Sequence, residues 1–209
     1  MSNILDALGI TNEAIETAKA EPSTGGFLWE SGAYPVEIKQ LAVFETASGA
    51  KMLKIEMYDE KEDKTLVEYA NTSYIDKQTK ERKENMSGVK IFKSLMSAIK
   101  LEPAAIQLVD KEIDAYAKKV QAQVITNAEG RKCVALVREV EDPNNEKYPL
   151  SNVVEAFADI ENKINGETAP VEKWLEKIAK APVLVKKAKK STQTAAKAAD
   201  TDAAKSLLG

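Results

Sequence analysis

The fold is decided by residues 32–74, which read GAYPVEIKQLAVFETASGAKMLKIEMYDEKEDKTLVEYANTSY. At the start of this stretch, Val36 and Ile38 alternate with Glu37 and Lys39, and the same period of two returns further along. Such alternation is typical of a β-strand with one buried face. Short polar turns separate the segments, so the stretch predicts an antiparallel meander. Its strands are expected at residues 32–46, 51–59 and 65–74.

The period changes after the meander. Residues 76–85, DKQTKERKEN, are too polar to be buried and predict a long loop or hairpin tip. In the following SGVKIFKSLMSAIKL, apolar residues recur at helical spacing from Val89 to Ile99. This predicts an amphipathic helix packed on the sheet. Pro103 ends the helix, and we expect a second helical segment within residues 102–116.

Strands return in the second half of the chain. Residues 119–126 and 148–157 are expected to be strands, and NAEG at 127–130 is expected to be a turn. Residues 131–141 contain CVALV, a run consistent with a strand buried on both sides. Helices are expected at both ends of the chain. They are predicted at residues 4–8, at residues 12–20 and from residue 169 onward.

The order of these elements indicates the fold class. Three strands, a helix, more strands and a closing helix lack the βαβ alternation of a doubly wound fold. We expect a mainly β protein with α: a five-stranded OB-fold barrel with an inter-strand helix and with N-terminal and C-terminal helices. The predicted parts are an N-terminal helical segment at 1–26, the OB-fold domain at 27–182 and a disordered tail at 183–209. The tail is low in complexity and has no aromatic residue.

Composition removes several classes of chemistry. The chain has 209 residues, no histidine and a single cysteine, Cys133. These counts exclude an intramolecular disulfide, a cysteine-based zinc site and a Ser-His-Asp triad. Neither phosphate-binding glycine motif, GxxxxGK[ST] or GxGxxG, occurs. We therefore expect no enzyme activity, no cofactor and no metal site, and we interpret DEKED at 59–63 as a solvated turn.

Aromatic and basic residues share the polar faces of the predicted strands. Lys54 and Tyr58, for example, are an even number of positions apart and lie on one face. Binding of single strands without sequence preference needs rings on which bases stack and cations that follow the phosphates. The pattern therefore predicts a single-stranded nucleic-acid site, although the net charge is −3. Its candidate residues are Lys39, Lys54, Tyr58, Tyr69, Asn71, Tyr74, Lys77, Lys80, Arg82, Lys83, Arg131, Arg138 and Tyr148.

Four segments carry a family resemblance. SGAYPVEIKQLAVFETASGAKMLKIEM, MSGVKIFKSLMSAIKL, GRKCVALVREVEDPNNEKYPLSNVVEAF and ENKINGETAPVEKWLEKI occur in this order. Through them, residues 27–182 resemble bacteriophage single-stranded DNA-binding proteins of the OB-fold type. The resemblance implies that the chain coats single-stranded DNA during phage replication, recombination or repair. Such proteins bind DNA with the barrel face and a mobile β-hairpin. The resemblance therefore implies that the DNA-binding residues are Lys54, Tyr58, Tyr69, Tyr74 and the basic residues between 77 and 83.

The resemblance also bears on partners and location. Proteins of this kind can contact phage replication or recombination proteins and can associate with one another on DNA, and both remain possible for this chain. The tail contains KKAKK at 186–190 and ends in SLLG, so recruitment of partners by an acidic tip is not expected. There is no run of ~18 apolar residues, and MSNILDALGITNEAIE does not have the features of a signal peptide. We expect a cytoplasmic protein of the infected bacterial host cell, with no membrane contact.

Two other functions stay open at this point. The barrel could serve as a phage accessory module that binds a protein, which the acidic net charge and the helices at both ends favour. A metal-dependent nuclease would need several carboxylates that converge on one concave site. The sequence scatters its acidic residues over turns and helix faces.

Overall fold

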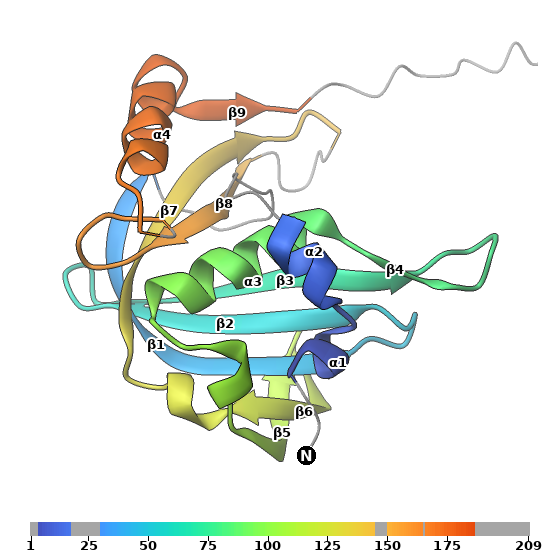
Figure 1. Ribbon diagram of the computed structural model, residues 1–209. Helices are drawn as coiled ribbons and strands as arrows, with labels where there is room; N and C mark the ends of the chain where they lie inside the picture. The colour runs from blue at the N-terminus through green and yellow to red at the C-terminus, as the bar shows by residue number, and fades with distance from the viewer. Residues whose placement is uncertain (1–3, 18–29, 145–149, 165, 187–209) are drawn as a thin grey trace, which may run out of the picture.

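The computed structural model describes residues 4–17, 30–144, 150–164 and 166–186. These residues form a mainly β structure with a few helices (Figure 1). The α-helices are α1 (Ile4–Leu8), α2 (Asn12–Thr17), α3 (Met86–Ala98) and α4 (Ala169–Lys180). The strands are β1 (Gly32–Glu45), β2 (Lys51–Asp59), β3 (Lys64–Ile75), β4 (Arg82–Glu84), β5 (Leu108–Ala115), β6 (Lys118–Ile125), β7 (Lys132–Glu141), β8 (Leu150–Ala158) and β9 (Val183–Val185).

The predicted meander is present as β1, β2 and β3, which pair antiparallel in chain order. Along one edge, residues 37–45 of β1 pair with β2. Along the other edge, residues 32–37 pair with β7 and residues 42–44 pair with β6. The register with β2 shifts between Ile38 and Gln40, where the second partner changes. Such a bulge bends a strand, so β1 can take part in two differently directed portions of the sheet.

One sheet contains nine strands, whereas the sequence predicted five barrel strands. Its main path is β4-β3-β2-β1-β6-β5, and β7 adds β8 on one edge and β1 and β9 on the other. All pairs are antiparallel except β7 with β9. The described part of the chain has no strand ladder between β3 and β8, so the sheet is open there.

The main core lies between the meander, β7, β8 and helix α3. Leu53 and Ile55 of β2 and Phe92 and Leu95 of α3 are fully buried in it. Burial of each such side chain stabilises the fold by roughly 1.5–3 kcal/mol. A second cluster lies on the opposite side of the meander, beneath the β5–β6 hairpin, and a third lies beneath α4. The meander is therefore covered on both sides.

Helix α3 lies where the sequence predicted an amphipathic helix. Asn85 caps its N-terminus, and its side chain accepts a hydrogen bond from the Ser87 N–H. Gly88 on the first turn lies directly against β3, where an added Cβ would be 1.9 Å from the Asn71 carbonyl oxygen. Only a residue without a side chain allows this approach. Gly88 thus determines how closely α3 packs on β3.

The structure corrects two predictions about secondary structure. Residues 102–116 were expected to be helical, but they form a short 3-10 turn at Pro103–Ala105 and then β5. Ile113 and Ala115 are buried while Asp114 between them is exposed, which is the period of a strand. The tail was expected to be disordered from residue 183, but Val183–Val185 form β9 beside β7. Residues 187–209 lie outside the described part of the chain. Among the described residues, no helix has the length and apolarity that crossing a membrane requires.

Candidate nucleic-acid interface

The β3–β4 hairpin forms an arm, defined here as residues 73–84, that extends away from the body of the sheet (Figure 1). Tyr74 pairs directly with Lys83 across the two strands, which brings a ring and a cation together. Tyr74 is 40% exposed, and Lys83 is also exposed. The arm is therefore a solvent-accessible element that carries an aromatic ring beside basic side chains.

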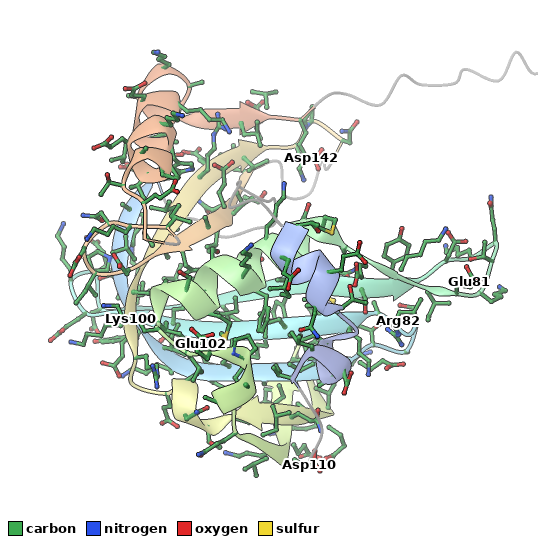
Figure 2. The ribbon with its side chains drawn as sticks, in the orientation of Figure 1. Glu81, Arg82, Lys100, Glu102, Asp110 and Asp142 are labelled. Atoms are coloured by element: carbon green, nitrogen blue, oxygen red, sulfur yellow. The ribbon has the colours of Figure 1, made fainter. Side chains whose placement is uncertain are left out.

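Two basic residues of the arm are held by internal contacts. Lys83 Nζ lies 2.7 Å from Asp76 Oδ2, and this contact lowers the pKa of the Asp76 carboxyl. Arg82 donates to the Gly49 carbonyl at 2.9 Å and to the Ser73 hydroxyl at 3.2 Å, so it fastens the arm to the β1–β2 turn. Figure 2 shows Arg82 near the foot of the arm and Glu81 near its end.

Lys77 and Lys80 lie in the turn of the arm and are both exposed. Neither side chain makes an ion pair or hydrogen bond with another described residue. Lys80 has a φ of 62°, the left-handed conformation that the turn needs at this position. These two lysines are available to an anionic ligand without loss of an internal contact.

The second group of candidates lies on the outer face, defined here as the surface of the meander opposite the main core. Cross-strand pairing aligns Ala42, Lys54 and Tyr69 in one row of this face. The neighbouring row on one side brings Phe44, Met52 and Asn71 together. Two rows away on the other side, Glu37, Tyr58 and Thr65 lie together.

Lys39, which is exposed, and Tyr58, which is half-buried, lie at one end of the outer face. Lys39 Nζ lies 5.2 Å from the centroid of the Tyr58 ring, within the range of a cation–π contact. Lys39 also pairs with Glu37 at 2.6 Å, and the Tyr58 hydroxyl donates to Asp63 at 2.8 Å. That hydrogen bond raises the pKa of Tyr58. A cavity of about 640 Å³ borders Tyr58. Its lining mixes both charge signs through Glu37, Asp59, Glu60, Lys61 and Lys132.

Lys54 is not available on this face. Its side chain is buried, and its ammonium group donates to Gln40 at 3.0 Å and to Glu56 at 2.8 Å. A buried ammonium group needs such partners because removing it from water is costly. We therefore do not retain Lys54 as a ligand contact, although it lies on the face that the sequence predicted.

Three aromatic rings form a cluster over the outer face. The Tyr69 and Tyr116 rings are stacked, with centroids 4.1 Å apart and planes inclined by 22°. Phe44 meets both rings edge-on, with centroids 6.2 Å from Tyr69 and 6.1 Å from Tyr116. The backbone N–H of Tyr116 donates to the Tyr69 hydroxyl at 3.2 Å. The tip of the β5–β6 hairpin is thereby attached to β3.

Tyr116 is not among the residues predicted from the sequence, because residues 102–116 were expected to be helical. The alternation of Ile113 and Ala115 with Val120 and Ala122 across a two-residue gap is the signal that could have found the hairpin. Tyr-Ala is an unusual pair for such a turn, which conceals the signal. Asn71, which was predicted, is half-buried, and its Oδ1 has no hydrogen-bond partner among the described residues.

The two predicted arginines of β7 and its preceding turn have structural contacts. Arg131 donates to the carbonyl oxygens of Ile99 and Lys100 just after helix α3. Arg138 is 3% exposed, lies 3.7 Å from the Glu155 carboxylate and donates to the Ala181 carbonyl. Neither guanidinium group is free to contact phosphate, so we do not retain either one. Tyr148, the remaining candidate, lies outside the described residues.

Strand β3 connects the two remaining groups. It carries Tyr69 and Asn71 on the outer face and continues into the arm at Tyr74. The structure thus aligns these candidates along one strand, but it separates the arm from Lys39 and Tyr58 at the far end of the face. Lys118 and Lys119, which the sequence analysis did not single out, are exposed beside Tyr116.

The acidic segment at 59–63 forms a turn. The Asp59 carboxylate accepts hydrogen bonds from the backbone N–H groups of Lys61 and Glu62. Among the described residues, no three potential metal ligands lie close enough together to hold an ion. Cys133 is buried in the main core, and burial raises the pKa of its thiol to about 12.

No protein-family model matches this chain, and no curated protein matches it either. The candidate interface therefore depends on the geometry of this chain alone: an exposed arm and an aromatic cluster, both carried by β3.

Proposed function

We propose that this chain binds and protects single-stranded DNA without catalysis and largely without sequence preference. The observation that carries the proposal is the placement of rings and free cations along β3. Tyr69, stacked with Tyr116, lies on the outer face, and Tyr74 lies in the arm near Lys77 and Lys80. Stacking platforms beside cations are the features that single-strand binders combine.

We further propose that the sheet is an OB-type barrel with additions. In this assignment β1, β2, β3, β7 and β8 are the five barrel strands, and α3 is the helix that follows the third. The β4 arm, the β5–β6 hairpin and β9 are added elements. The pairing of β7 with both β1 and β8 supports this order.

The open side between β3 and β8 is where such a barrel would close. Glu68 of β3 is almost completely buried, which raises the pKa of its carboxyl, and the nearby backbone of Val154 on β8 acts in the opposite direction. A side chain of β3 thus lies close to the β8 backbone where an OB barrel would have a backbone ladder. Helix α3 packs on both β3 and β8 beside this gap.

The biological setting is the part of the proposal that depends on resemblance. The resemblance of four segments to bacteriophage single-stranded DNA-binding proteins suggests a coat for strands exposed in phage replication, recombination or repair. Cytoplasmic location in the infected host and contacts with phage proteins belong to the same proposal. The arm and the aromatic cluster are the surfaces that would meet the strand.

Fluorescence anisotropy of a labelled oligo(dT) tests the proposal. A label on the oligonucleotide is preferable to the fluorescence of Trp174, which is 3% exposed and lies on the buried face of α4. We expect binding at low ionic strength that weakens as salt rises, because phosphate contacts release counterions. A duplex of the same length should bind more weakly, since its bases are not available for stacking. Absence of binding to oligo(dT) at low ionic strength would refute the proposal.

A protein-binding module is the second candidate function. Ile160 is 69% exposed and lines the cavity of about 640 Å³ beside Tyr58, where it offers a partner protein an apolar contact among charged side chains. Size-exclusion chromatography with and without oligo(dT) separates the two functions. The DNA-binding proposal predicts earlier elution with the oligonucleotide, whereas unchanged elution would favour the protein-binding module.

A further inference from the structure

The tip of the β5–β6 hairpin has a backbone conformation that does not suit its residues. Ala115 pairs with Lys118, so Tyr116 and Ala117 alone form the turn. Their φ angles are 50° and 57°. Positive φ at both central positions is the geometry of a type I′ turn, which favours Asn-Gly. Tyrosine and alanine adopt it only at a cost, because the Cβ approaches the following carbonyl oxygen.

The strained turn holds the Tyr116 ring in one orientation. One face of the ring stacks on Tyr69, its edge region meets Phe44, and the Tyr116 N–H donates to the Tyr69 hydroxyl. These contacts fix the ring before any ligand arrives. A ring fixed in advance loses little conformational freedom when a ligand stacks on it.

The exposure of Tyr116 distinguishes it from a ring that only covers the apolar cluster. It is 54% exposed, although Tyr69 and Phe44 beneath it are half-buried and buried. A covering role would not require an aromatic ring at the strained tip, since Asn-Gly would close the same hairpin without strain. Strain that persists at one residue is typical of sites where the side chain is needed for function.

Cations lie next to this ring in the sequence. Lys118 follows the turn and is exposed, and it has no ion pair with a described residue. Lys119 lies 3.1 Å from Asp114, and both of these side chains are largely exposed. An exposed pair of this kind is weak and easily exchanged for another anion. The tip thus presents one open ring face with two lysines beside it.

We propose that the tip of the β5–β6 hairpin is a base-stacking site for a single-stranded nucleotide. A nucleobase stacks on the open face of Tyr116, and Lys118 contacts the adjacent phosphate. The inference rests on the proposed binding of single-stranded DNA and adds to it a residue and an element that the sequence analysis did not include.

The test compares wild type with Tyr116→Asn on two oligonucleotides of equal length and charge, oligo(dT) and its abasic counterpart. Asparagine tolerates positive φ, so the variant removes the ring while it suits the turn. We expect affinity for oligo(dT) to fall roughly 5- to 150-fold, and affinity for the abasic strand to stay unchanged. Urea unfolding and circular dichroism check that the variant is folded. Lys118→Gln should weaken binding of both strands to the same extent.

The outcomes separate this inference from the broader proposal. If wild type binds oligo(dT) and Tyr116→Asn binds it equally well, the stacking site is refuted while the DNA-binding function stands. An equal loss on both strands would also refute it, because a base contact cannot affect an abasic strand. If wild type binds neither strand, the proposed function fails and the stacking site fails with it. Tyr116→Trp offers a second readout: its fluorescence should change with oligo(dT) and not with the abasic strand.

Discussion

At the residue scale, Glu68 is a buried carboxyl beside the open side of the sheet, between β3 and β8. It lies on the core side of β3, between Leu66 and Ala70, and its carboxyl is close to the Val154 backbone of β8. Its Oε2 has no hydrogen-bond partner among the described residues. Burial opposes the charged form and raises the pKa of Glu68 to about 8. The carboxyl is therefore largely neutral in the folded protein at pH 7.

This pKa predicts how stability changes with pH. The pKa of Glu68 in the folded protein, about 8, is above the ordinary value of 4.5. Folding therefore retains a proton that the unfolded chain releases, and stability falls as pH rises from near 4.5 through 8. Glu68→Gln cannot ionise and should lose this dependence. Between pH 6 and pH 9, wild type should lose about 2–3 kcal/mol of unfolding free energy relative to the variant. Urea unfolding measures it, and parallel pH profiles would contradict the assignment.

Tyr74 provides the residue-scale prediction for binding. Because the ring is 40% exposed in the arm, Tyr74→Ala should leave the unfolding free energy nearly unchanged. Loss of one stacking platform should weaken oligo(dT) binding by about 1–3 kcal/mol. Leu175→Ala on α4 is the matched control, since Leu175 is also exposed and apolar but lies far from the arm. Equal binding by wild type and Tyr74→Ala would remove Tyr74 from the interface.

At the element scale, the sequence predicted those elements whose pattern is local. The meander, helix α3 and helix α4 follow from alternation and helical spacing, and each forms near its predicted residues. The β5–β6 hairpin could not be predicted in this way. Residues 110–112, DKE, suit a helix, and the strand forms because it pairs with β6 and because Ile113 and Ala115 pack on the outer face. Tertiary packing overrides local preference here.

The candidate site was predictable only in part for a related reason. The sequence predicts correctly that Lys54 and Tyr58 lie on one face of the strand. Whether a residue on that face is exposed depends on what packs over it, which the alternation does not show. The β5–β6 hairpin lies over part of this face, and Lys54 is paired with Glu56 and Gln40. Arg138 is likewise buried, since helix α4 and Glu155 enclose it. The arm residues Lys77 and Lys80 were predicted because polarity alone keeps them in solvent.

Helix α3 gives the prediction at this scale. The Gly88→Ala change would bring a Cβ to 1.9 Å from the Asn71 carbonyl oxygen, so α3 must move away from β3. We expect a loss of roughly 1–3 kcal/mol of unfolding free energy, the usual cost of overpacking. Ser87→Ala, one position earlier and exposed, should have little effect. Urea unfolding compares the two variants, and equal stabilities would show that the contact is not tight.

At the scale of the whole molecule, the net charge of −3 would repel an anionic ligand if all charges acted equally. Charges separated by more than about 10 Å are largely screened at physiological salt, so the local arrangement decides. Many lysines are neutralised within the fold, as Lys54 is by Glu56 and Lys83 is by Asp76. Lys77 and Lys80 in the arm and Lys118 at the hairpin tip are exposed without such pairs among the described residues. These cations, at the periphery of the outer face, are the ones that could meet phosphate.

The salt dependence of the dissociation constant for oligo(dT) measures how many phosphate contacts the arm makes. It should be measured for wild type, for Lys77→Gln/Lys80→Gln in the arm, and for Lys173→Gln/Lys177→Gln on α4. The two double variants change the net charge equally, and α4 lies on the opposite side of the molecule from the arm (Figure 1). For single strands, each phosphate contact contributes about 0.7 to the slope of log affinity against log salt. The slope should be shallower by roughly 1.4 for the arm variant, which lacks two phosphate contacts. The α4 variant should have the wild-type slope. No binding by wild type, or one slope shared by all three proteins, would contradict the proposed binding of DNA by the arm.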